Sequence, residues 1–150
     1  MIKLCIFDFD GIFTDGNIYF DSSGNITKYY NVKDGTGIKL LENNNIVVGC
    51  ISGFKENKSQ TTILNHLNIK YKAFKVSNKL DKLKEWCSNL KIDIHSEVAY
   101  MGDDINDLEC LKIVKISGTP KDGHKTCIKV STFISNYYGG DGCVRDFCEH

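Results

Sequence analysis

The chain has little of several features that would point away from an ordinary globular enzyme. It contains one proline among 150 residues, which excludes a proline-rich linker or tail. Its 19 basic and 19 acidic residues cancel, so no net charge favours nucleic acid as a partner. No apolar run is long enough to cross a bilayer, and aspartate interrupts MIKLCIFDFD too early for a signal peptide. We therefore expect a cytoplasmic protein that binds neither nucleic acid nor membrane.

The cysteines show no pairing pattern. There are seven, an odd number, and none belongs to a CxxC pair. This excludes a zinc site of the usual spacing and a complete disulfide framework. In the cytoplasm we expect them to be reduced, and those in apolar runs to pack as small hydrophobic side chains.

Apolar runs of strand length alternate with segments of helical periodicity. Strands are predicted over residues 2–7, 46–51, 71–76, 98–101, 114–116 and 133–134. Helices are predicted over 37–44, 55–67, 78–90, a segment ending at 111, 121–130 and 141–149. The alternation predicts a single α/β domain over residues 1–150, with a doubly wound, mostly parallel sheet.

Residues 17–32, NIYFDSSGNITKYYNV, interrupt this alternation after the first strand. Two β-prone segments flank DSSGN, which predicts an inserted β-hairpin. A bare hairpin is marginal in water, and this one carries several aromatic side chains. We expect it to pack on something else, such as another subunit. The aromatic residues are Tyr19, Phe20, Tyr29 and Tyr30.

Polar residues collect where the predicted strands end. In open α/β sheets, ligands bind beyond the carboxyl ends of the strands. Each of these groups alone is typical of a capped turn, but their succession at four strand ends favours a functional site. The groups are Asp8-x-Asp10, Ser52-Gly53, Ser77-Asn78-Lys79 and Gly102-Asp103-Asp104.

These groups suit phosphoryl transfer through an aspartyl phosphate. One carboxylate attacks phosphorus, and a second acid protonates the leaving oxygen and later activates water. This division of work explains why Asp8 and Asp10 stand together despite their repulsion. Mg²⁺ prefers the hard oxygen ligands that several aspartates provide, and a hydroxyl, N–H groups and a lysine neutralise phosphoryl oxygens.

With the motifs DFDG, ISG, NK and GDDIND in this order, the chain resembles phosphatases of the haloacid dehalogenase (HAD) superfamily. The resemblance implies a HAD-like, Rossmannoid fold. It also implies that Asp8 is the nucleophile and Asp10 the general acid/base. Ser52 would hold the phosphoryl group and Lys79 would clamp it, with Lys82, one turn further, as the rival lysine.

The same resemblance implies a Mg²⁺ site. Its ligands would be the carboxylates of Asp8 and Asp103 and the backbone carbonyl of Asp10. Asp104 and Asp107 would support either the metal site or the clamping lysine.

Longer segments narrow the resemblance. DGIFTDGNIYF, NVKDGTGIKLL, SNKLDKL, VAYMGDDINDLECL and GGDGCVRDF resemble the capless phosphatases of 2-keto-3-deoxy sugar acid phosphates. These hydrolyse octulosonate 8-phosphate or nononate (sialate-type) 9-phosphate and are homotetramers with clustered hairpins. The resemblance implies no cap domain, substrate contacts by Gly53, Asn78, Lys33 and Arg145, and a C-terminal segment that reaches a neighbour. Octulosonate enzymes commonly carry arginine after ISG; Phe54 and the loop SGFKEN are closer to the nononate branch.

Two alternatives remain open at this stage. A phospho-receiver signalling domain is also doubly wound, but it has an adjacent acid pair after the first strand and its phosphoacceptor on a middle strand. The second alternative is an inactive HAD-like subunit associated with acylneuraminate cytidylyltransferase, because similar domains are fused to cytidylyltransferases of that kind. The resemblance also implies that DGTG at 34–37 forms a turn near the site, and its place at a core position of a predicted helix indicates that Trp86 is a packing residue.

Overall fold

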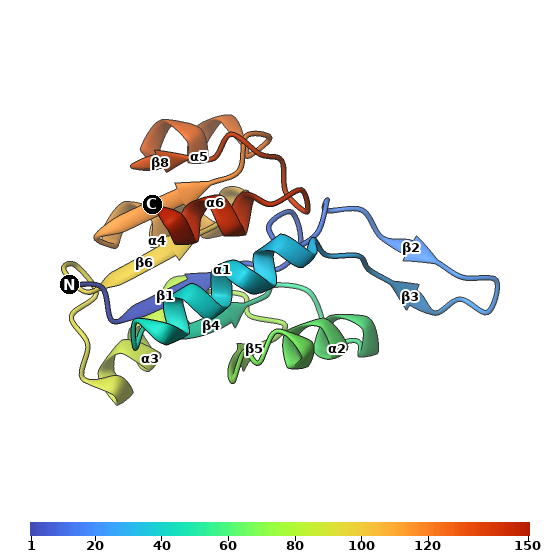
Figure 1. Cartoon of the computed structure of the whole chain (residues 1–150), viewed down its shortest axis with the longest axis horizontal. Coiled ribbons are helices and arrows are strands. Elements are labelled where there is room, and N and C mark those ends of the chain that lie inside the picture. The colour runs from blue at the N-terminus through green and yellow to red at the C-terminus, as the bar shows by residue number, and fades with distance from the viewer.

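The computed structural model describes all residues from 1 to 150 and has a six-stranded, wholly parallel sheet at its centre (Figure 1). Its spatial order is β5-β4-β1-β6-β7-β8. The strands are β1 (Leu4–Phe7), β4 (Val47–Ile51), β5 (Tyr71–Ala73), β6 (Val98–Met101), β7 (Ile116–Thr119) and β8 (Phe133–Ile134). The predicted parallel α/β sheet is confirmed, and no cap domain covers it.

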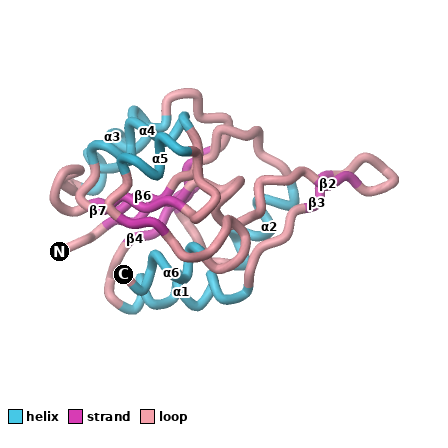
Figure 2. Tube along the Cα trace, turned by 90° about the horizontal axis from the view of Figure 1, so that it is seen from above, coloured by secondary structure: helices cyan, strands magenta, loops and turns pink.

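Helices cover both faces of the sheet, as the doubly wound prediction requires (Figure 2). One face carries α1 (Val32–Asn43), α2 (Lys58–His66) and α6 (Cys143–Glu149). The other carries α3 (Lys79–Leu90), α4 (Leu108–Ile113) and α5 (Lys125–Val130), with the short 3₁₀ helix η1 (Ile105–Asp107) before α4. None of these helices combines the length and the apolar character that a membrane crossing requires.

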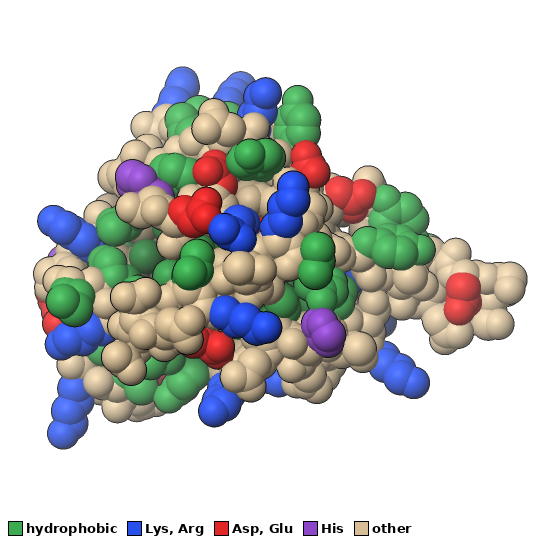
Figure 3. Space-filling view, in the orientation of Figure 1, with side chains coloured by type: hydrophobic (Ala, Val, Ile, Leu, Met, Phe, Trp, Pro, Cys, Tyr) green, Lys and Arg blue, Asp and Glu red, His purple; other side chains and the backbone are tan.

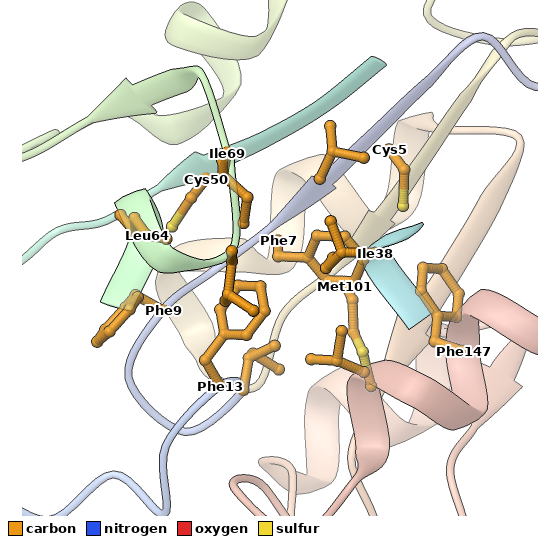
Figure 4. Packing of buried hydrophobic residues seen from close by; sticks show 14 of the residues in the cluster. Cys5, Phe7, Phe9, Phe13, Ile38, Cys50, Leu64, Ile69, Met101 and Phe147 are labelled. Carbon is orange, nitrogen blue, oxygen red and sulfur yellow. The ribbon is translucent and has the colours of Figure 1, made fainter. Parts of the chain in front are cut away.

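The central strand β1 is buried on both sides, which explains its unbroken apolar run. Cys5 and Phe7 point into the core under α1 and α6 (Figure 4), and Leu4 and Ile6 point into the core under α3 and α4. Trp86 belongs to this second core, as predicted. Two layers of packing therefore fix the end of β1, where the candidate site begins.

The helix α1 begins at Val32, five residues earlier than the sequence pattern predicts, and the predicted DGTG turn is wrong. Asn31 caps this helix by accepting a hydrogen bond from the Lys33 N–H (2.9 Å). Gly37 is needed because a Cβ there would lie 3.0 Å from the Arg145 Cα of α6. Gly37, the last residue of the expected turn, therefore serves close packing between two helices.

The hairpin, β2 (Tyr19–Phe20) with β3 (Ile26–Thr27), projects from the carboxyl end of the sheet (Figures 1 and 2). Hydrophobic side chains gather on it near its base (Figure 3). Phe20 is 66% exposed and Tyr29 is 67% exposed, and Tyr29 meets Tyr19 edge to face. Within one chain, this aromatic surface is uncovered.

Asp34 gives the packing of α6 on α1 a pH dependence. Its buried Oδ1 accepts a hydrogen bond from the Arg145 N–H (3.0 Å), its Oδ2 has no partner, and burial raises the pKa of its carboxyl group to about 7. Because this exceeds the unfolded value of about 4, the proton stabilises the fold. That contribution is complete below about pH 4 and is lost as the pH rises through 7.

We therefore expect Asp34→Asn to raise the thermal unfolding midpoint at pH 8 by several degrees, and to change it little at pH 4. The asparagine keeps the acceptor for Arg145 and removes the buried charge. Melting curves of the variant and of Asp122→Asn, an exposed control, at both pH values check this. An equal shift at both pH values would contradict it.

Candidate active site

The predicted polar residues meet at one end of the sheet. Asp8 follows β1, Ser52 follows β4 and Asp103 lies just beyond β6. The chain reverses its direction of strand addition between β1 and β6, which is where open sheets bind ligands. A cavity of about 220 Å³ lies there, lined only by polar residues and glycines. They are Asp8, Asp10, Gly16, Ser52, Gly53, Asp103, Asp104 and Asn106.

Lys79 is the lysine of this site. It lies in the first turn of α3, and its side chain is completely buried. Its Nζ lies 2.9 Å from Oδ1 of Asp8 and 2.7 Å from Oδ1 of Asp107. The rival Lys82 instead pairs with Glu85 on the surface of the same helix. The structure therefore brings Lys79, and not Lys82, to the acidic cluster.

Asp107 holds this arrangement together. Besides Lys79, its Oδ1 accepts a hydrogen bond from the Tyr100 hydroxyl (2.7 Å). Its Oδ2 accepts from the N–H groups of Asp103 (3.1 Å) and Asp104 (3.3 Å). Four donors satisfy both oxygens, so Asp107 fixes the lysine and the loop and is not available as a metal ligand, although its carboxylate lies close enough.

The remaining pair, Asp8 and Asp103, fits a metal ion. Burial first, and then the charges of Asp107 and Asp103, raise the pKa of Asp8 well above its usual range, against the opposing effect of Lys79. Burial and Asp107 raise the pKa of Asp103 to about 7. Oδ1 of Asp103 is buried and has no partner. Repelling carboxylates with an unsatisfied oxygen are the hard donor set that Mg²⁺ prefers.

Gly11 allows these two loops to approach. Its φ of +83° lies in the left-handed region, and a Cβ there would lie 2.1 Å from Oδ2 of Asp103. Asp103 therefore reaches the loop after β1 only because residue 11 has no side chain.

Ser52 is oriented as a donor toward the cavity. Its Oγ accepts hydrogen bonds from Nε2 of the buried Gln60 (2.9 Å) and from the Phe54 N–H (3.2 Å). A hydroxyl has two acceptor positions and one proton, so the proton is left to donate. The N–H of Gly53 beside it makes no hydrogen bond within the chain. The Ser52 hydroxyl and the Gly53 N–H can together bind an anion.

Three other predicted site residues lie outside the cavity, and a fourth lies at its rim. Asn78 caps α3 by accepting from the Asp81 N–H, and Asp104 lines the rim and caps η1. Lys33 is exposed on α1. Arg145 lies on α6, and its guanidinium pairs with Glu149 at 2.5 Å. The structure brings neither Lys33 nor Arg145 to the acidic cluster of its own chain.

Sequence reasoning missed several residues of the site, and two of them orient its functional groups. Gln60 is completely buried in α2 and orients Ser52. Lys28, on the arm that leaves β3, is buried with its ammonium on Oδ1 of Asp10. No motif or spacing marks either residue; a single glutamine in a helix and a single lysine after a strand are common on surfaces.

The receiver alternative fails on topology. Counted along the chain, the strands of the large sheet lie in the order 3-2-1-4-5-6. A receiver of the flavodoxin-like type requires 2-1-3-4-5. Fold and site instead define a hydrolase that acts on phosphate esters through a carboxylate cluster at the switch point.

Comparison with known proteins agrees with this class. The profile of the haloacid dehalogenase-like hydrolases matches residues 40–145, and the chain belongs to this family. It is 35% identical over 152 residues to the 3-deoxy-D-manno-octulosonate 8-phosphate phosphatase KdsC of Salmonella typhi, covering 99% of this chain and 78% of that one. The enzyme of the same name from Escherichia coli K12 is 34% identical with the same coverage.

A solved structure is similar over the whole chain. The octulosonate 8-phosphate phosphatase of Moraxella catarrhalis, in complex with magnesium, phosphate and KDO, superimposes with a TM-score of 0.94 at 32% identity. The match covers 99% of this chain and 84% of that one. The cobalt-bound enzyme of Haemophilus influenzae superimposes with a TM-score of 0.91 at 27% identity, and the match covers 99% of this chain and 85% of that one.

Proposed function

We propose that this chain is a Mg²⁺-dependent phosphatase that hydrolyses 3-deoxy-D-manno-octulosonate 8-phosphate through an aspartyl-phosphate intermediate. The observation that carries the proposal is the buried Asp8–Lys79 pair beside Asp103, at the switch point of the sheet. The whole-chain similarity to enzymes of that name supports the choice of substrate.

In this proposal Asp8 attacks phosphorus with a carboxylate oxygen, and the bond from phosphorus to the sugar oxygen breaks. Asp10 gives its proton to that oxygen. It then takes a proton from water, which attacks phosphorus, breaks the acyl phosphate bond and frees Asp8 and inorganic phosphate. Ser52 and the Gly53 N–H donate to phosphoryl oxygens, and Lys79 holds Asp8. Mg²⁺, held by Asp8 and Asp103, supplies positive charge that offsets the negative charge of the phosphoryl group.

The substrate's sugar acid needs contacts that the small cavity does not supply. Arg145 stays a prediction as a ligand of its carboxylate, and Lys33 and Asn78 stay predictions as further substrate contacts. Phe54 stands where octulosonate enzymes commonly have arginine. The named relatives favour octulosonate 8-phosphate over nononate 9-phosphate, and direct comparison of the two esters decides between them.

The test is phosphate release from octulosonate 8-phosphate, nononate 9-phosphate and glycerol phosphate. We expect the highest kcat/KM for the octulosonate ester, no turnover after exhaustive chelation, and recovery with Mg²⁺. Ca²⁺ should inhibit, because its longer bonds and larger coordination number would misplace Asp8. Full activity in chelator would overturn the proposed metal dependence, and absence of turnover on all three esters would support the inactive-subunit alternative.

We also propose that the chain assembles as a homotetramer through its hairpins. The supporting observation is the exposed aromatic surface of Tyr19, Phe20 and Tyr29, which a monomer would leave in water. We expect Phe20→Glu to dissociate the assembly and to lower activity, whereas Ser22→Asp at the exposed hairpin tip should do neither. Light scattering and the phosphate assay check this; an active monomeric wild-type protein would contradict it.

The proposed place of action is the cytoplasm, and the proposed unit is the whole chain as one catalytic domain with the hairpin as its flap. All seven cysteines are free and six are buried. Thiols in that state suit a reducing compartment.

A further inference from the structure

Lys28 occupies an unusual position for a lysine on a hairpin arm. The residue is 6% exposed, and its Nζ hydrogen-bonds Oδ1 of Asp10. The ammonium also lies over two aromatic rings, 4.7 Å from the centre of Phe54 and 5.5 Å from that of Phe9. Its backbone N–H donates to Oγ of Ser59 in α2 (2.9 Å). Lys28 thus joins the hairpin, α2 and the loop after β1.

Stability alone does not account for a charge in this position. The ammonium has one hydrogen-bond acceptor, Asp10, and the two rings offset only part of the cost of its burial. An apolar side chain of the same length would fill the space between the rings at lower cost. The ion pair therefore points to a task at Asp10.

Asp10 has no other group that holds its carboxylate. Lys28 binds Oδ1, and no protein donor reaches Oδ2, while the residue lines the cavity. A carboxylate that is 28% exposed could otherwise rotate among several orientations. The lysine fixes one oxygen and leaves the second free at the edge of the space where a leaving oxygen would lie.

We propose that Lys28 is a positioning residue, which holds the Asp10 carboxyl group in the orientation that proton transfer to and from the substrate requires. This inference rests on the proposed function, in which Asp10 is the general acid/base. Because Lys28 lies on the arm that follows β3, the position of the hairpin controls the geometry of the catalytic loop. A hairpin displaced from α2 withdraws the ammonium from Asp10.

The test is Lys28→Met, which keeps the length of the side chain and removes its charge. With octulosonate 8-phosphate and Mg²⁺ we expect kcat to fall about 10- to 100-fold, as for a displaced catalytic group, with KM within about threefold. In an Asp10→Asn background the same change should alter kcat less than about twofold, because the group being positioned is already gone. Lys58→Met, an exposed lysine of the neighbouring groove, should behave like the wild type.

Thermal melts verify that each variant is folded. If Lys28→Met does not fold, Lys28→Arg replaces it: the charge stays, the donor moves, and we expect the same fall in kcat with KM retained.

Three results would overturn the inference. An unchanged kcat would show that Asp10 needs no positioning. A raised KM with normal kcat would make Lys28 a substrate-binding cation, facing the groove between β3 and α2. If the fold-changes in kcat of Lys28→Met and Asp10→Asn multiply in the double variant, Lys28 has a structural role that is independent of Asp10. Failure of the proposed function is distinguishable, because the wild-type protein itself would then release no phosphate.

Discussion

Asp8→Asn is expected to lower phosphate release by at least about 10⁴-fold while the chain keeps its fold. An amide cannot form the acyl phosphate that the proposed mechanism requires. The change also removes a buried carboxylate whose pKa is held well above its usual range by burial and by two neighbouring acids. The metal-free variant should therefore unfold at the same temperature as the wild type or at a higher one.

The matched control is Asp81→Asn, an exposed aspartate in the first turn of α3, which should keep full activity. Phosphate assays and thermal melts of both variants give the comparison. If Asp8→Asn kept more than about a hundredth of the wild-type rate, the nucleophile would have to be another group.

Asp8, Ser52 and Asp103 were predictable because each lies at or just beyond the end of a strand. In a parallel sheet the strand ends meet at one edge, so Asp8, Ser52 and Asp103 converge whatever the details of packing. Lys79 was predictable in part: its place after the cap of α3 was evident, but only the structure separates it from Lys82. For residues of this kind, a position beside the end of a strand or the start of a helix is enough to predict that they lie at the site.

Lys28 and Gln60 could not be predicted in the same way. Their contacts exist because the hairpin arm and α2 come together over the loops after β1 and β4. Neither contact follows from neighbouring residues, since Lys28 and Asp10 are 18 positions apart and lie on different segments. Local patterns do not encode where an inserted hairpin will lie.

Several element boundaries were wrong, two of them for a related reason. The resemblance implied a turn at DGTG, yet α1 begins at Val32 and contains the whole DGTG segment, where Gly37 allows α6 to pack closely. The strand β7 begins at Ile116, later than predicted, and includes Gly118, where a Cβ would lie 2.6 Å from the Phe147 ring. In both places tertiary packing overrides the local preference of glycine.

Asp107→Ala is expected to give the largest loss of stability of any single change at the site. The carboxylate is fully buried and accepts from Lys79, Tyr100 and two backbone N–H groups. Its removal leaves a buried ammonium with only Asp8 and strands three further donors without partners. Breaking a buried ion pair costs about 3–5 kcal/mol. We expect the unfolding midpoint to fall by about 10 °C.

Activity should fall in the same variant, because Asp107 holds Lys79 against Asp8 and fixes the loop that carries Asp103. Glu109→Ala is the matched control: its exposed pair with Lys112 should contribute less than about 1 kcal/mol. Tyr100→Phe removes one of the four donors and should cost about 1 kcal/mol. Chemical denaturation of the three variants, each at a concentration where the assembly is unchanged, gives the free energies of unfolding. An Asp107→Ala protein within about 1 kcal/mol of the wild type would mean that Lys79 finds another acceptor and that the network is not what holds the site.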